Sequence, residues 1–291
     1  MGDRAESVVV RDRRGNRFRV STADAVIGKE LYIGGDYDGD VVDLVVGELT
    51  ARGFKPALVV DVGANIGTVT VDLLARFPHA RGIAIEPDET NFRLLEENIE
   101  ANGLAGRVVA LCEAAGAVDG EAELELSPDN FGDHRIRVAS AAPGRYGEER
   151  RATRRVPVRR LDGLIERGVA QAGVPTLVWA DVQGHEAQLL AGAQMFHDVP
   201  VVLELWPYGL RRAGGRELLG ELTGAWAAVV DLRGGRRELR PADLAALLDE
   251  IEARPYAAST DVLLLPESLT GGGVNRRRAE SSDGEREVAP G

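Results

Sequence analysis

The sequence contains few cysteines, lysines and histidines, and each scarcity limits its chemistry. Its 291 residues include a single cysteine, Cys112, which excludes an internal disulfide and a cysteine-based zinc site. Because Cys112 follows the apolar run 108–111, we interpret it as a buried, inert thiol rather than a nucleophile. Only Lys29 and Lys55 accompany the many arginines, and we attribute this imbalance to codon usage rather than to a ligand that requires arginine.

The chain also lacks a basic balance and a long apolar run. Its formal net charge of -12 argues against a general nucleic-acid surface, which would need a basic face to neutralise phosphates. No apolar run could span a bilayer, the amino terminus has no basic-then-apolar signal, and Glu6 stands where a myristoylation motif needs Ser or Thr. We therefore expect a cytoplasmic protein whose partner is a small molecule rather than a nucleic acid or a membrane. Nothing in the sequence predicts its oligomeric state.

A strand, a glycine-rich turn and a helix follow one another in the region 58–77. The β-branched run 58–62 ends in small residues, and residues 68–77 have helical spacing. Gly63 and Gly67 lack side chains, so a ligand could approach the backbone of the turn closely. A second apolar run ends in Glu86, roughly 20 residues beyond the glycines, where a carboxylate can accept both hydroxyls of a ribose. This arrangement predicts a site for a nucleoside cofactor.

The spacing of the turn selects among nucleoside cofactors. A P-loop needs Lys and then Ser or Thr after its last glycine, whereas Thr68 and Val69 follow Gly67, so ATP is not expected. The dinucleotide pattern Gly-x-Gly-x-x-Gly is absent, and Asp61 would repel a pyrophosphate but suit a cationic cofactor. S-adenosylmethionine is therefore favoured over NAD or FAD, and over a turn that only packs helix on strand. The predicted cofactor-binding residues are Asp61, Gly63, Ala64, Asn65, Gly67, Glu86, Pro87 and Glu113, the last as a weaker adenine contact.

The pattern along the chain divides it into three parts. Residues 1–55 are predicted to form a small amino-terminal cap, with a hairpin over 7–20 and a helix over 37–52. Strands and helices then alternate through 56–266, which predicts an α/β domain with about seven core strands and helices on both faces. The insertion 117–160 interrupts this alternation with strands at 121–126 and 154–160, and we interpret it as a substrate lid. Residues 267–291 lack periodicity and are predicted to be a disordered tail.

The predicted core elements, in chain order, are the strands 58–62, 81–86, 107–112, 176–182, 199–205, 226–232 and 261–265, and the helices 67–77, 88–102, 161–169, 185–194, 208–223 and 241–253.

Three motifs together resemble those of a known family. They are Asp61-x-Gly63-Ala64-Asn65-x-Gly67, the pair Glu86-Pro87, and Asp181-Val182-Gln183-Gly184-His185-Glu186. Over residues 56–266 the chain is similar to the FkbM-type branch of class I S-adenosylmethionine-dependent methyltransferases. The resemblance implies a Rossmann-like sheet of seven mostly parallel strands whose last strand is antiparallel. It also implies O-methylation of a sugar or polyketide-type hydroxyl in natural-product biosynthesis.

The chain departs from that family around the third motif. The family commonly has a lysine two residues before the aspartate and a glutamate two residues after it, whereas this chain has Trp179 and Gln183. The charge beside the predicted fourth strand is thus altered, which leaves the substrate open. The segment 130–135 also resembles a motif found in part of the family.

Methyl transfer to an alcohol requires alignment of the reacting atoms and a group that removes the hydroxyl proton. Asp181 ends the predicted fourth strand, at the edge where open α/β sheets bind ligands, and is the first candidate for this role. The alternative is a carboxylate that only ties the turn together. The other catalytic candidates are His134 in the insertion, His185 at a helix start and Glu204 at the end of the fifth strand, each of which could instead be structural.

The acceptor pocket is predicted from residues near these candidates. Asp133 and Arg135 flank His134 and could bind a polyhydroxyl or carboxylate substrate, and Trp206 could wall the pocket. A divalent metal held by Asp133, His134, Asp181, His185 and Glu204 is not favoured, because no ligand spacing enforces it. We therefore predict an S-adenosylmethionine-dependent O-methyltransferase of a small molecule. N-methylation of an amine and a non-catalytic methyltransferase-like binding subunit are the alternatives.

Overall fold

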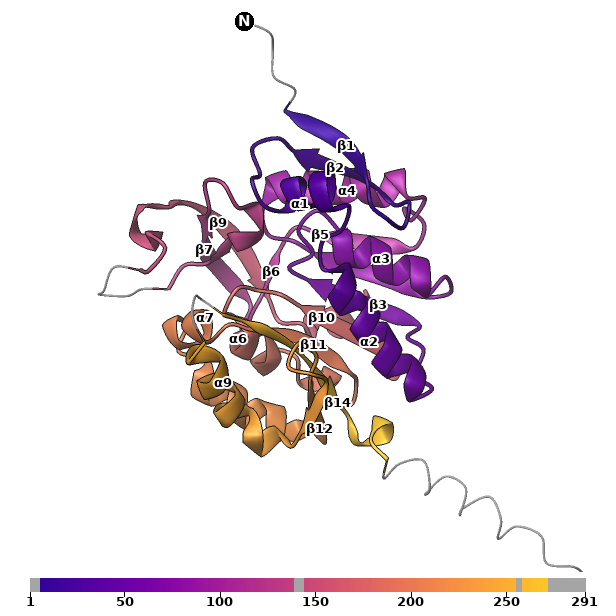
Figure 1. Ribbon diagram of the computed structural model, residues 1–291, viewed down its shortest axis with the longest axis vertical. Helices are drawn as coiled ribbons and strands as arrows, with labels where there is room; N and C mark the ends of the chain where they lie inside the picture. The colour runs from indigo at the N-terminus through magenta and orange to yellow at the C-terminus, as the bar shows by residue number, and fades with distance from the viewer. Residues whose placement is uncertain (1–5, 139–143, 255–257, 272–291) are drawn as a thin grey trace, which may run out of the picture.

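A mostly parallel sheet of eight strands forms the centre of the molecule (Figure 1). The computed structural model describes residues 6–138, 144–254 and 258–271. The strand order across the sheet is β13-β12-β14-β11-β10-β3-β4-β5. Neighbouring strands from β11 to β5 pair in parallel, whereas β14 is antiparallel to both β11 and β12. The strands are β3 (Leu58–Val62), β4 (Arg81–Ile85), β5 (Val108–Leu111), β10 (Thr176–Ala180), β11 (Val201–Leu205), β12 (Ala228–Asp231), β13 (Arg237–Leu239) and β14 (Thr260–Leu265).

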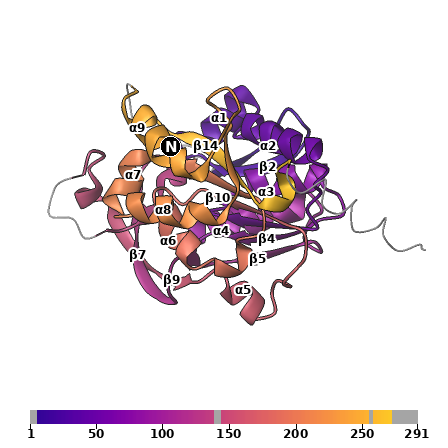
Figure 2. The ribbon, with the colours of Figure 1, turned by 90° about the horizontal axis from the view of Figure 1, so that it is seen from below.

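Helices cover both faces of this sheet, as the view in Figure 2 shows. Because successive strand residues point to opposite faces, Val59, Ala84 and Leu177 belong to one hydrophobic cluster and Val60, Ile83 and Val178 to the other. The first cluster includes residues of α1 (Ile27–Gly34), α2 (Gly39–Ala51), α3 (Thr68–Arg76) and α4 (Glu89–Ala101). The second includes residues of α5 (Gly163–Glu166), α6 (Glu186–Ala191), α7 (Pro207–Arg212), α8 (Arg216–Leu222) and α9 (Leu244–Glu252). The predicted Rossmann-like architecture, with its antiparallel last strand, is confirmed.

The amino-terminal hairpin is fastened to a helix of the domain. Strands β1 (Ser7–Arg11) and β2 (Arg17–Ser21) pair antiparallel, as the sequence predicts, and lie beside α4 in Figure 1. The Asn102 side chain donates to the carbonyl of Arg17 at 2.7 Å and accepts from its N–H at 2.9 Å. Asn98 makes the same pair of bonds with Arg19, at 3.1 and 2.6 Å. These amides replace the partner strand that the exposed edge of β2 lacks.

The insertion forms its own sheet of four strands, in the order β6-β9-β7-β8. Its strands are β6 (Ala114–Ala115), β7 (Gly120–Leu126), β8 (Arg135–Ile136) and β9 (Ala152–Arg159), with short 3₁₀ turns at Phe131–Asp133 and Glu148–Arg150. Leu124, Val156 and Val158 form a small hydrophobic cluster of this sheet, together with Ala114. In Figure 1 the sheet stands at one side of the central sheet. It carries residues 131–136 to the cavity described below.

Several elements differ from the prediction. The helix expected over 208–223 is two helices, α7 and α8, because Gly214 adopts a left-handed φ of +65° and Gly215 lies where a Cβ would be 2.9 Å from the Cβ of Ala187. The edge strand β13 and the helix α1 were not predicted. A 3₁₀ turn (Glu267–Leu269) begins the segment expected to be disordered, and residues 272–291 of that segment lie outside the described residues. Among the described helices, none combines the length and apolar character needed to cross a membrane.

Candidate active site

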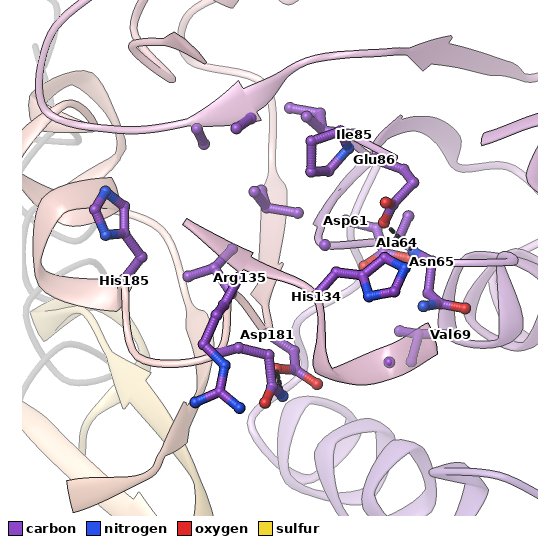
Figure 3. Close-up of a pocket in the computed structure, with 18 of the residues that line it drawn as sticks. Asp61, Ala64, Asn65, Val69, Ile85, Glu86, His134, Arg135, Asp181 and His185 are labelled. Atoms are coloured by element: carbon purple, nitrogen blue, oxygen red, sulfur yellow. Dashed lines mark hydrogen bonds between the residues drawn. The ribbon is translucent and has the colours of Figure 1, made fainter. Parts of the chain in front are cut away.

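A cavity opens at the carboxyl ends of β3, β4 and β10. About 860 Å³ of space, counted up to the open mouth, lies between residues of the glycine turn, the inserted sheet and the amino-terminal segment. Figure 3 shows Glu86, Asn65 and His134 near one another, and Arg135 and Asp181 farther along the cavity. The cavity therefore occupies the edge where open α/β sheets bind their ligands.

The glycine turn after β3 passes against the backbone that follows β10. Gly63 has a φ of +79°, and a Cβ at this position would lie 1.9 Å from the carbonyl oxygen of Asp181. Only glycine fits such an approach. The backbone N–H groups of Gly63 and Ala64 both donate to the carbonyl of Ile85, at 2.9 and 3.0 Å. The turn is thus held between the two neighbouring strands and contributes bare backbone to the cavity.

Glu86 fixes the turn from the end of β4. Its Oε2 accepts from the backbone N–H of Asn65 at 3.0 Å, and its Oε1 accepts from that of Asp88 at 2.8 Å. Burial, opposed by these two backbone bonds, raises the pKa of Glu86 to about 8. Each carboxylate oxygen can accept more than one hydrogen bond, so both keep acceptor capacity toward the cavity. Glu86 therefore both anchors the turn and lines the cavity.

Asp61 lies near the end of β3 and is 2 % exposed. Its carboxylate accepts from the hydroxyl of Thr70 on α3. Burial raises the pKa of Asp61 to about 7, while the bond from Thr70 lowers it and the charge of Asp181 raises it further. Asp61 consequently places one acid in the cavity floor beside the glycine turn.

Asp181 directly follows β10 and is linked to Glu204 on β11 by one side chain. Gln183 donates from Nε2 to Asp181 Oδ1 at 2.8 Å and to Glu204 Oε2 at 3.2 Å. The backbone of Gln183 is left-handed, with φ +53°, which brings its amide between the two acids. Burial raises the pKa of Asp181 to about 6, with a smaller rise from Asp261, and burial with Asp181 raises that of Glu204. The two carboxyls form one coupled pair at the carboxyl ends of adjacent strands.

The amino-terminal segment adds an acid and a phenol to this end of the cavity. Tyr37 and Asp38 line it, and burial raises the pKa of Asp38 to about 7 and that of the Tyr37 phenol above its ordinary value. Arg233 lies 3.9 Å from Asp38 and forms an ion pair with Asp261. The single guanidinium of Arg233 thus faces the carboxyls of Asp38 and Asp261, with Asp181 nearby, and this end of the cavity is electronegative.

His134 enters the cavity from the inserted sheet. Its Nδ1 accepts from the backbone N–H of Ser127 at 3.1 Å, so the proton of the neutral ring resides on Nε2. Burial lowers its pKa, although Asp88 and Asp133 oppose the shift. The ring of Phe131 lies 5.6 Å away, centroid to centroid. In its neutral form His134 can therefore donate from Nε2, while its basic nitrogen is occupied.

His185 lines the cavity at the start of α6, and burial alone lowers its pKa to about 4. The neighbouring Glu186 is fully buried and accepts from the N–H groups of Val182 and Gly184 at 3.3 and 3.1 Å. Glu186 thereby closes the turn that follows Asp181, which accounts for its place in the motif. His185 is left as a neutral imidazole at the cavity wall.

Arg135 separates the cavity from an aromatic group behind it. Its guanidinium lies 4.8 Å from the ring centroid of Trp206 and donates to Asp133 Oδ1 at 2.5 Å. Arg151 also binds Asp133, through Oδ2 at 2.5 Å and the backbone carbonyl at 2.8 Å. Asp133 therefore holds two arginines instead of facing the cavity. Trp206 lies behind Arg135 and lines a second cavity.

The cavity brings together most of the predicted site residues. It is lined by Asp61, Gly63, Ala64, Asn65, Glu86, Pro87, Glu113, His134, Arg135, Asp181 and His185. Glu113 is also ion-paired with Arg167 at 2.7 Å. Gly67, Asp133, Glu204 and Trp206 are not among the lining residues: Gly67 starts α3 with φ +90°, and Glu204 reaches Asp181 through Gln183.

Several residues that line the cavity were not predicted from the sequence as site residues. Ile27, Tyr37 and Asp38 come from the amino-terminal segment, and Trp179 and Gln183 come from the motif around Asp181. The departure from the family pattern at positions 179 and 183 was a usable signal for the last two. No pattern in the sequence could place the first three. Within the described ranges, no group of three or more His, Cys, Asp or Glu side chains is arranged to hold a metal ion.

The family model for the methyltransferase FkbM domain matches residues 61–206, half of the chain, and includes the glycine turn and the segment around Asp181. The chain belongs to the FkbM methyltransferase family. The predicted family is thus confirmed, and with it the general activity of methyl transfer. A comparison with curated proteins found no match.

Solved structures of other methyltransferases are similar to this FkbM protein at low identity. The SAM-dependent methyltransferase from Agrobacterium tumefaciens is 11% identical over 91% of this chain and 72% of its own, with a TM-score of 0.46. TYW2 of M. jannaschii, solved in complex with AdoMet, is 11% identical over 90% and 86%, with a TM-score of 0.40. A precorrin-6y C5,15-methyltransferase from Geobacter metallireducens is 13% identical over 78% and 87%, with a TM-score of 0.36.

Proposed function

We propose that this chain transfers a methyl group from S-adenosylmethionine to a hydroxyl of a small-molecule acceptor. The observation that carries the proposal is a single cavity that combines the bare backbone of the glycine turn with Asp61, Glu86 and Asp181. S-adenosylmethionine supplies an electrophilic methyl group on a sulfonium. The contribution of the chain is then to bind, to orient and to remove a proton.

The residues around the turn fit this cofactor. Gly63 and Ala64 line the cavity, so the backbone of the turn is exposed to a ligand there. Glu86 has acceptor capacity for the two hydroxyls of a ribose, and Asp61 is an acid for the cationic methionine portion. Neither acid would suit a pyrophosphate. These features support S-adenosylmethionine over NAD or FAD.

Asp181 is the group best suited to take the hydroxyl proton. Its pKa of about 6 is close to neutrality, where a base combines ionisation with useful proton affinity. Gln183 holds the carboxylate by its Oδ1, at the wall of the cavity. The proton removed from the hydroxyl would reside on Asp181 and could be shared with Glu204, because the two acids are coupled. Glu204 is then a positioning residue behind Asp181.

His134 is better suited to orient the acceptor than to deprotonate it. With Nδ1 engaged by Ser127, the neutral ring presents an N–H to the cavity. An N–H donor can hold an acceptor oxygen in line with the transferring methyl group. Arg135 would contribute a fixed guanidinium at the same wall, and His185, neutral through burial, is the remaining candidate base.

N-methylation is the second candidate, and the acidic end of the cavity favours it. Asp38, Asp181, Glu204 and Asp261 interact with one another, while Arg233 is the cation that lowers the pKa of Asp38 and Asp261. An ammonium-bearing acceptor would be attracted to such a group. Methylation of an amine would still require a base, since the ammonium must lose a proton before it attacks.

Calorimetry tests the cofactor assignment. We expect S-adenosylmethionine and S-adenosylhomocysteine to bind with measurable heat and NAD to give none. Binding of NAD, with no heat from S-adenosylmethionine or S-adenosylhomocysteine, would overturn the proposal. A radiolabelled methyl-transfer screen over hydroxylated and amine-bearing small molecules then distinguishes O-methylation from N-methylation. Absence of transfer to any acceptor, with the cofactor bound, would favour a binding subunit instead.

A further inference from the structure

A second cavity lies behind the wall formed by Arg135. Its lining residues are Arg145, Tyr146, Trp206, Pro207, Tyr208, Arg211, Ile251, Glu252, Arg254 and Ala258. Trp206 follows β11 just as Asp181 follows β10, so the two cavities meet at the carboxyl ends of neighbouring strands. Arg135 lines the first cavity and Trp206 the second, and the Arg135 guanidinium lies 4.8 Å from the centroid of the Trp206 ring.

Three aromatic rings give this second cavity one apolar wall. The centroid of Trp206 lies 5.1 Å from that of Tyr208 and 5.7 Å from that of Tyr146, and the two tyrosines are 5.3 Å apart and nearly perpendicular. The Tyr208 hydroxyl donates to the fully buried Glu148 at 2.7 Å and accepts from the backbone N–H of Arg145 at 2.7 Å. These bonds fix the rings, so the wall is formed before a ligand arrives. Aromatic rings held in this way pack well against a flat ring of a ligand.

The charge of this cavity is opposite to that of the whole chain. Three arginines and one glutamate line it, whereas the chain carries a net charge of -12. Arg211 is ion-paired with Glu252, and Arg254 with Glu250. Arg145 lies 5.8 Å over the ring of Tyr208, and no acid pairs with it among the residues that the structure describes. Its guanidinium is therefore available to an anionic group of a ligand.

We propose that this second cavity binds the distal part of the acceptor, a flat ring that bears a carboxylate or a phosphate. The ring packs on Trp206 and Tyr208, and the anionic group binds Arg145. The second cavity is lined by arginines and the first by acids, so the two ends of the acceptor bind in a fixed orientation. The anionic group is attracted to the arginines, and the reacting group extends past Arg135 to Asp181. This inference rests on the proposed function, because it takes the first cavity as the place of methyl transfer.

The test uses simple ring anions as probes and the full chain. Phenyl phosphate and benzoate are titrated by ligand-observed NMR, with phenol and inorganic phosphate as probes that have only the ring or only the charge. We expect phenyl phosphate or benzoate to bind more tightly than either single-feature probe, and the tighter of the two identifies the anion. Arg145→Gln should weaken that binding about tenfold, the usual effect of losing a charge-assisted bond.

Arg150→Gln is the matched control, because Arg150 lies five residues away, its side chain is 83% exposed and it does not line the cavity. It should leave probe binding unchanged. Equal binding of the ring anions to wild type and Arg145→Gln, or an equal loss in both variants, would overturn the proposal. S-adenosylhomocysteine calorimetry on the same samples is the separate measurement. Its failure in wild type would contradict the proposed function and leave the result for the second cavity standing.

Discussion

Substitution of Glu86 separates its two roles, anchor of the glycine turn and ligand of the cofactor. In Glu86→Ala the N–H groups of Asn65 and Asp88 both lose their acceptor. Each stranded buried donor costs about 1–3 kcal/mol, so the free energy of unfolding should fall clearly. Glu86→Gln keeps one carbonyl oxygen for one N–H but turns its amide NH₂ toward the other. Its loss of stability should therefore be about half that of the alanine variant.

Cofactor binding is the second readout. If Glu86 accepts the ribose hydroxyls, both variants should bind S-adenosylhomocysteine more weakly by about 1–3 kcal/mol, which corresponds to roughly 5- to 150-fold in Kd. Urea unfolding measures the first effect without cofactor, and calorimetry at a temperature where each variant is folded measures the second. The two effects are separable because the free energy of unfolding is measured without cofactor, whereas the Kd for S-adenosylhomocysteine is measured on the folded protein.

Glu113→Gln is the control for the unfolding measurement alone, since Glu113 lines the same cavity but pairs with the part-exposed Arg167 instead of the backbone. Loss of such a pair costs about 1 kcal/mol or less. An unfolding free energy unchanged by Glu86→Ala would refute the anchoring role. Unchanged affinity for S-adenosylhomocysteine in a folded Glu86→Gln variant would remove Glu86 from the ribose.

Two further predictions concern catalysis and pH. Asp181→Asn and His134→Ala should each lower turnover roughly 10²–10⁴-fold, with cofactor affinity nearly unchanged. Only Asp181→Asn should remove the acidic limb of the pH–rate profile. Near-normal turnover in both variants would refute both roles and leave His185 and Glu204 as the candidate bases. Burial raises the pKa of Asp61 to about 7 and that of Glu86 to about 8, above their values in the unfolded chain. Their contribution to stability is thus full at acidic pH and is lost as pH rises through these values. His185 is neutral in the folded protein and mostly neutral in the unfolded chain above about pH 7, so it contributes little there. Urea unfolding of the cofactor-free protein should therefore give a falling free energy from pH 7 to 8, by up to about 1.4 kcal/mol per pH unit for each proton released. A rise over this window would contradict the assignment.

Local chemistry let the sequence predict the sheet and the residues of the glycine turn and Glu86 that line the cavity. The runs 58–62 and 81–85 are apolar on both faces, which only strands buried in a parallel sheet require. Gly63 was selected because a turn against a ligand needs a residue without a side chain, although in the structure the group that requires glycine is the carbonyl of Asp181. Glu86 could be selected because a strand end places an acid at the ligand edge. Asp88 stands just before α4, where its side chain accepts from the N–H groups of Thr90 and Asn91 and caps the helix. In each case the signal and the structure lie within a few residues of one another.

Only the tertiary structure determined the part of the cavity around Asp181. The strand order places Asp181 near Glu204 and against Gly63, and chain folding brings Tyr37 and Asp38 from the amino-terminal segment onto the same cavity. The role of His134 depends on one bond from Ser127, and that of Asp133 on Arg151, contacts that no local pattern encodes. The sequence by itself determined which residues could bind a nucleoside cofactor, because that needs only a strand, a turn and an acid at fixed spacing. The tertiary structure decided which further groups face the cavity, because burial, tautomer and charge depend on neighbours far apart in the chain.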